Sequence, residues 1–173
     1  TDSGAVVVAG NTQLNAGANP ITLNTAGNTF AGTVKVNDNV TALTLVDTTA
    51  IQLNTISGLA LGPTGLINIT ANGITQAVAL NITGPATFNG GSGAVVLTNP
   101  LNSYGGAITV SGGSAQLFVA SGEQAQLKAG TVTTTGSFAL TTDPGIGFGL
   151  LGGAGGFTLT QADLANFNVG TFN

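Results

Sequence analysis

Six acidic side chains are the residues of this sequence best suited to acid and base chemistry. They are Asp2, Asp38, Asp47, Glu123, Asp143 and Asp163. A pair of carboxylates can cleave a glycosidic bond, with one acting as acid and the other as base or nucleophile. These six are scattered along the chain, a distribution more typical of hydrated corner residues. We therefore predict no catalytic residue, and we expect that the chain is not an enzyme.

Other catalytic and metal-binding chemistries lack the residues that they need. The chain of 173 residues contains no Cys and no His. This excludes Ser/His and Cys/His nucleophile systems and metal sites with Cys or His ligands. The two basic residues, Lys35 and Lys128, are too few to neutralise the phosphates of a nucleic acid. We expect no cofactor, no metal and no nucleic-acid partner.

Two glycine-rich patterns imitate ligand-binding motifs. The spacing GxGxxG occurs at Gly147, Gly149 and Gly152, but a dinucleotide site needs a helix after it, and more glycines follow here. The calcium-roll pattern GGxGxDxUx begins at 90–93 and at 152–155, but apolar residues occupy both aspartate positions. We therefore expect loops or turns at these places, without bound ligands.

Hydrophobic periodicity predicts that β-strands position the acidic side chains and the glycine-rich turns. Apolar residues alternate in short runs that are rich in Val, Ile and Thr and are bounded by Gly, Asn, Asp or Ser. The runs are 21–23, 34–36, 43–45, 66–69, 95–97, 108–110 and 117–119. The only helical candidate is 160–167, where Thr160 and Asp163 have the spacing of a capping box.

An internal repeat distinguishes a solenoid from a sandwich or a barrel. Residues 10–53 align without a gap onto 84–127 at an offset of 74. That offset fits about three coils of roughly 25 residues, each with short strands. We therefore predict an all-β fold, a right-handed parallel β-helix (β-solenoid) of about seven or eight coils. In it, 1–173 is a single solenoid segment with repeat units 10–83 and 84–162, and 163–173 is a terminal strand or cap.

One motif of the repeat resembles a known family. An apolar strand is followed by Asn, any residue, an aromatic residue, any residue and Gly, and then by another apolar strand. The motif occurs at Asn28, Phe30 and Gly32, and again at Asn102, Tyr104 and Gly106. It resembles the β-strand repeats of the filamentous-haemagglutinin-like and autotransporter-passenger adhesins of bacteria. The resemblance implies a secreted or cell-surface protein whose role is structural or adhesive, as a rigid stalk or filament subunit.

The ends of the sequence and this resemblance suggest the partners. The apolar run 5–9 and the alternating segment 167–173 both look like open strand edges. We therefore expect head-to-tail self-association or flanking coils of a longer chain, and host or bacterial surface glycans as ligands. The uncharged stretch 145–160 is too rich in glycine for a membrane span. The alternative function is that of a β-helical protein that binds or cleaves polysaccharides.

Overall fold

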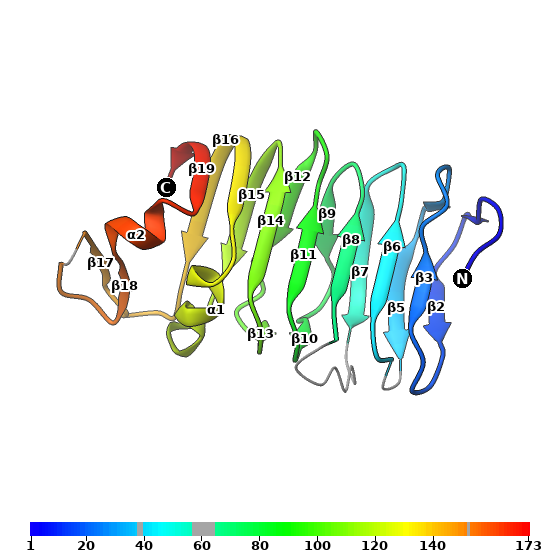
Figure 1. Cartoon of the computed structure of the whole chain (residues 1–173), viewed down its shortest axis with the longest axis horizontal. Helices are drawn as coiled ribbons and strands as arrows, with labels where there is room; N and C mark the ends of the chain where they lie inside the picture. The colour runs from blue at the N-terminus through cyan, green and yellow to red at the C-terminus, as the bar shows by residue number, and fades with distance from the viewer. Residues whose placement is uncertain (38–39, 57–64, 152) are drawn as a thin grey trace.

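The computed structural model describes residues 1–37, 40–56, 65–151 and 153–173. Nearly all the regular structure is β, and parallel strands stack along the long axis from the N-terminal to the C-terminal end (Figure 1). The predicted β-solenoid is confirmed, with about six turns. The number of turns is below seven or eight because 142–151 and 153–166 form short elements at the C-terminal end instead of a further coil.

Two parallel faces carry most of the strands. The first face contains β2 (Thr12–Asn15), β5 (Thr33–Asn37), β7 (Ile51–Ile56), β9 (Ile74–Gln76), β12 (Ala94–Leu97) and β15 (Ser114–Phe118). The second face contains β3 (Ile21–Leu23), β6 (Leu43–Val46), β8 (Ile67–Thr70), β11 (Ala86–Asn89) and β14 (Ile108–Gly112). The long strand β16 (Val132–Thr141) joins the faces, since its start pairs with β14 and its end pairs with β15.

Shorter elements lie at the edges and at the C-terminal end. Two pairs of short strands form a partial third side: β1 (Val7–Val8) with β4 (Thr29–Phe30), and β10 (Asn81–Ile82) with β13 (Ser103–Tyr104). The other elements are η1 (Ser121–Glu123), α1 (Gln124–Lys128), β17 (Phe148–Leu150), β18 (Phe157–Leu159), α2 (Gln161–Leu164) and β19 (Phe167–Phe172). Strand β19 pairs with β16 as a last rung.

The turn of the solenoid is shorter than the turn expected from the repeat offset. In the coils from β1 to β16, paired residues are 19 to 24 positions apart. The shortest separation is Thr33 opposite Gln52, and the longest is Leu43 opposite Ile67. Between β10 and β13, Asn81 pairs with Ser103, 22 positions further along the chain. Three turns of this length are shorter than the repeat offset of 74 by about a third of a turn. The offset therefore maps β3 of the second face onto β12 of the first face.

The two edges of the solenoid exchange roles along the chain. Edge A denotes the connections from the second face to the first, and edge B those from the first to the second. In the first turns the short strand β4 lies at edge A, whereas β10 and β13 lie at edge B. From β6 onward the connections at edge A are short, and Gly113 alone links β14 to β15. The third side has therefore moved from one edge to the other.

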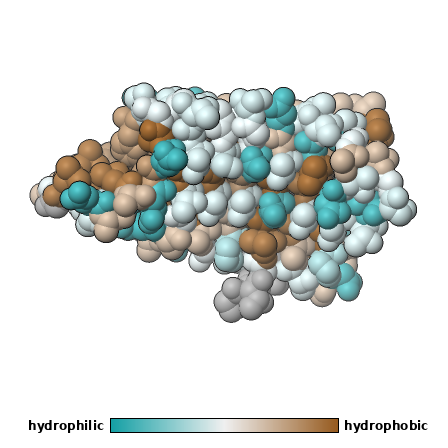
Figure 2. Space-filling view, turned by 45° about the horizontal axis from the view of Figure 1, so that its top comes forward, coloured by the Kyte–Doolittle hydropathy of each residue, from teal (hydrophilic) through white to brown (hydrophobic). Residues whose placement is uncertain are grey.

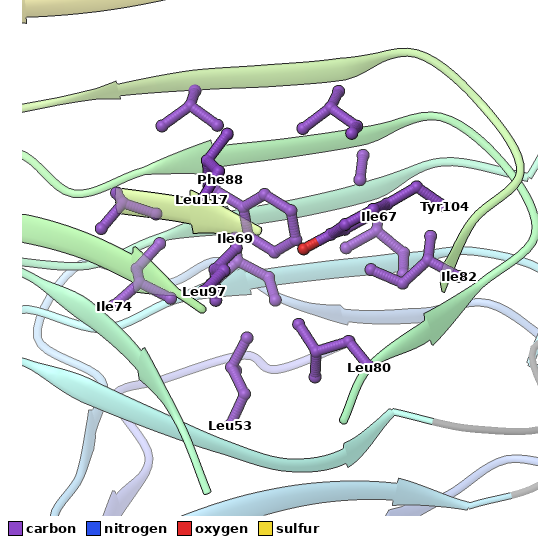
Figure 3. Close-up of a cluster of buried hydrophobic side chains, with 14 of the residues drawn as sticks. Leu53, Ile67, Ile69, Ile74, Leu80, Ile82, Phe88, Leu97, Tyr104 and Leu117 are labelled. Atoms are coloured by element: carbon purple, nitrogen blue, oxygen red, sulfur yellow. The ribbon is translucent and has the colours of Figure 1, made fainter. Parts of the chain in front are cut away.

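A narrow hydrophobic core runs between the faces. Successive coils place like residues on top of one another, as in the register series Leu45, Ile69, Phe88 and Val110. All four side chains are buried, and Figure 3 shows the middle of this core. The core closes at the C-terminal end around Phe138. Its ring contacts two rings of the last rung, with centroids 5.6 Å from Phe167 and 5.4 Å from Phe172.

Candidate functional site

The two copies of the asparagine motif connect neighbouring coils through buried asparagines. Asn28 and Asn102 are 0% and 4% exposed. The backbone N–H of Val6 donates to Asn28 Oδ1 at 2.8 Å, and that of Leu80 donates to Asn102 Oδ1 at 2.9 Å. Each donor precedes its asparagine by 22 positions, the spacing of neighbouring coils. Each asparagine side chain therefore adds a contact between neighbouring coils directly beside the short strand pairs β1–β4 and β10–β13.

A second polar side chain holds each asparagine. Asn28 Nδ2 donates to Asp2 Oδ2 at 2.7 Å, and Asn102 Nδ2 donates to Gln76 Oε1 at 2.9 Å. Asp2 and Gln76 are separated by the repeat offset, so they are equivalent in the repeat. The sequence alignment, which began at residue 10, missed this pair. The signal was present in the spacing, since both residues precede their asparagine by 26 positions.

An acid from the following coil binds the aromatic residue of each copy. The backbone N–H of Phe30 donates to Asp47 Oδ2 at 3.0 Å, and that of Tyr104 donates to Glu123 Oε1 at 3.0 Å. Glu123 lies two positions beyond the residue aligned with Asp47, which is Ser121. The repeat therefore does duplicate an acid, which the ungapped alignment concealed.

The aromatic side chains fill equivalent buried sites. Phe30 and Tyr104 are each 1% exposed, and the Tyr104 oxygen is directed into the core cluster (Figure 3). Asn102 Nδ2 also lies 3.2 Å from the Tyr104 hydroxyl, to which it donates. Burial, and then the charge of Glu123, raise the pKa of Tyr104. The phenol therefore acts as a neutral core group.

The motif glycines allow backbone contact between coils. A Cβ on Gly32 would lie 2.5 Å from the carbonyl carbon of Gly10, and a Cβ on Gly106 would overlap the backbone of Gly84 and Pro85. Gly10 and Gly84 are themselves related by the repeat offset. Because the coils touch through their backbones here, any side chain would force them apart.

The remaining described acids also bind backbone groups. Asp143 Oδ2 accepts hydrogen bonds from the backbone N–H and the hydroxyl of Ser121, both at 2.7 Å. Asp163 accepts from the backbone N–H of Thr160 at 2.8 Å in a capping box on α2, and it pairs with Lys128 at 3.5 Å. The backbone hydrogen bond from Ser121 is the main cause that lowers the pKa of Asp143, and the one from Thr160 is the main cause that lowers the pKa of Asp163.

The carboxylates are therefore used to hold the chain together. Each of the five in the described part of the chain accepts a backbone N–H, from a neighbouring coil or a helix cap. Asp38 lies outside the described residues. No group of three or more possible acidic, His or Cys metal ligands occurs among the residues described.

The glycine-rich patterns lie in turns and strands. Gly149 lies in β17, which pairs with β18, and β18 rather than a helix follows the pattern. Gly152, the last glycine of GxGxxG, lies outside the described residues. The aspartate positions of the calcium-roll pattern hold Val95 and Phe157, whose side chains are buried in the core.

Two hollows open at opposite ends of the molecule. One, of about 320 Å³, lies on the first face at β2, β5 and β7 and is lined by Asn11, Thr12, Gln13, Thr33, Lys35 and Asn54. The other, of about 270 Å³, lies at the C-terminal end and is lined by Leu140, Phe148, Leu150, Phe172 and Asn173. The first is polar and the second is apolar.

Comparison with known proteins finds a repeat family. The family model described as "Repeats of unknown function (DUF5649)" matches residues 1–37 and 40–111. The matched region contains both copies of the asparagine motif. No curated protein and no solved structure matches the chain. Among the described residues, no helix has the length and hydrophobicity needed to cross a membrane.

Proposed function

Since this chain belongs to the DUF5649 family of repeats of unknown function, we propose that it works through its architecture. It is a rigid segment of a stalk or filament in a secreted bacterial surface adhesin. The observation that carries this proposal is the use of its polar side chains. Asp2, Asn28, Asp47, Asn102 and Glu123 all join one coil to the next.

Rigidity follows from this use of polar groups. Every coil is held to its neighbours by parallel backbone pairing on two faces, and the motif adds side-chain bonds at the edges. Asn28 and Asn102 are buried in these contacts, and buried hydrogen bonds of this kind help to hold a chain in one arrangement. Cleavage of a polysaccharide would instead need carboxylates that are available to substrate, and the five described ones are bound to backbone groups. The structural role is therefore preferred to the enzymatic alternative.

The ends of the stack support association with further coils. Strands β2 and β3 end the two faces at the N-terminal side, and β19 ends the stack at the other. Unpaired strand edges bind other strands readily. Apolar surface gathers at the C-terminal end, where Phe148, Leu150 and Leu151 are exposed (Figure 2). Head-to-tail stacking, with another copy or with flanking coils, would cover this surface.

A matched pair of variants tests the stacking. Val7, on the end strand β1, is 75% exposed, and Leu101, in a turn near the middle of the solenoid, is 78% exposed. We expect sedimentation velocity to show oligomers that grow with concentration. Val7→Lys should reduce them by placing a charge at the stacking end, whereas Leu101→Lys should leave them unchanged. A chain that stays monomeric at all concentrations, or equal effects of the two variants, would contradict head-to-tail stacking.

A further inference from the structure

The polar hollow on the first face lies over an irregularity of the sheet. Between β5 and β7, Val34 pairs with Leu53, but Val36 pairs with Ile56. One extra residue of β7 is therefore inserted between these pairs, as in a β-bulge. Bulges bend a strand and redirect its side chains, and they are common beside binding sites. Asn54, at this bulge, is one of the residues that line the hollow.

Hydrogen bonds hold one wall of the hollow in place. Asn11 Oδ1 accepts from the backbone N–H of Thr33 at 3.0 Å and from its hydroxyl at 3.1 Å. Asn54 Nδ2 donates to the Thr33 hydroxyl at 3.5 Å. Three successive coils thus contribute one connected row of amide and hydroxyl groups. Beside this row, Gln13 and Lys35 are register partners on β2 and β5.

The charge of Lys35 is unusual in this molecule. The chain has two basic residues, and the other one, Lys128, pairs with Asp163. Within the part of the chain that the structure describes, Lys35 makes no ion pair. Among the described residues that line the hollow there is no carboxylate. A single cation surrounded by amides and hydroxyls is suited to a ligand that combines one negative charge with several hydroxyl groups.

We propose that this hollow, formed by Asn11, Gln13, Thr33, Lys35 and Asn54, binds a carboxylate-bearing sugar residue of an acidic glycan. Lys35 binds the carboxylate, and the amides and hydroxyls bind the sugar hydroxyls. The volume of about 320 Å³ lies at the small end of ligand pockets, as for a single sugar unit. The proposal names the ligand class of the adhesive role proposed above and rests on it. An acidic peptide is disfavoured, because it would leave most of these hydroxyl-binding groups unused.

The experiment measures binding by NMR titration of the whole chain. The probes are trigalacturonic acid and 3′-sialyllactose, and their neutral counterparts are the methyl ester of the former and lactose. We expect at least one acidic sugar to shift the backbone amides of Gln13, Lys35 and Asn54, and both neutral sugars to bind more weakly by about tenfold or more. Lys35→Gln and Gln13→Glu should each weaken binding similarly, whereas Lys128→Gln should not.

Three results would overturn the proposal. These are binding of neither acidic sugar, equal binding of the neutral sugars, and unchanged binding in Lys35→Gln. A polyglutamate peptide that binds as tightly as the sugars would also overturn the sugar assignment. The stalk proposal is tested separately, because sedimentation of the unliganded chain does not depend on this hollow.

Discussion

The two copies of the asparagine motif perform one task at opposite edges of the solenoid. The first copy lies at edge A around Asn28, and the second lies at edge B around Asn102. In the first, a charged residue, Asp2, holds the asparagine; in the second, the neutral Gln76 does so. The comparison shows that the motif is a local device for joining two coils. The motif joins two coils wherever a short third side is present, at either edge of the solenoid.

The largest effect is expected at the motif glycines. Gly32→Ala and Gly106→Ala each place a methyl group against backbone of the preceding coil. We expect each to lower the free energy of unfolding by about 3 kcal/mol or more, as measured by urea denaturation. Gly122→Ala is the control, because nothing lies near its Cβ position. If only one of the two motif variants were destabilising, the copies would not be equivalent.

Loss of the buried asparagines should have the next largest effect. Asn28→Ala leaves the N–H of Val6 without its acceptor, and Asn102→Ala does the same to Leu80. We expect losses of about 1–3 kcal/mol in unfolding free energy. The loss should be greater for Asn102, which also donates to Leu97 O and to the hydroxyl of Tyr104. Asn15→Ala, at an exposed position of β2, should leave the free energy of unfolding nearly unchanged. A loss there as large as that at Asn28 or Asn102 would mean that the motif asparagines have no special role in stability.

The aromatic position should be less sensitive. Tyr104→Phe removes one hydrogen bond from Asn102 and keeps the ring, as Phe30 does in the first copy. The expected loss is about 1 kcal/mol or less, read from the midpoint of urea denaturation. A loss as large as that of Asn102→Ala would mean that the hydroxyl, and not the ring, defines the second copy.

The smallest expected effect is a difference in pH dependence between the two copies. The hydrogen bond from Asn28, with further ones from Thr25 and Asn24, lowers the pKa of Asp2 to about 2. The stabilisation is complete above the ordinary pKa of 3.8 and is lost as the pH falls through the folded value. In NMR titration, the amide of Thr25 should shift with a midpoint near 2. The amide of Asn99, bonded to Gln76, should not follow it; a shared midpoint would contradict the assignment.

The strands and one helix start were predictable from local patterns. Alternation around Leu43 and Leu45 predicted β6, and the capping box of Thr160 and Asp163 is present at the start of α2. The helix is shorter than 160–167, because Phe167 already belongs to the last rung, β19. Local patterns sufficed here because alternation and capping depend on neighbours within a few residues.

The placement of the repeat was not predictable from the alignment. Leu53 and Leu127 align, and both are fully buried, but Leu53 lies in β7 and Leu127 in α1. An inward leucine meets the core from either element, so the sequence match does not distinguish them. The shift between faces depends on how many residues each corner uses, and corners range from Gly113 alone to the long connection 119–131. The partners of Asn28 and Asn102 were missed because they precede the aligned region.

A pair of engineered disulfides tests the solenoid most directly. The chain has no cysteine of its own, so pairs can be introduced cleanly. Thr87 and Thr109 are register partners on β11 and β14, at a strand separation suited to a disulfide. Thr87 and Val96 flank the turn 90–93 on different faces, whereas an antiparallel hairpin would place them opposite each other. We expect Thr87→Cys/Thr109→Cys to oxidise readily and Thr87→Cys/Val96→Cys to stay reduced. The reverse result would contradict parallel stacking of the coils.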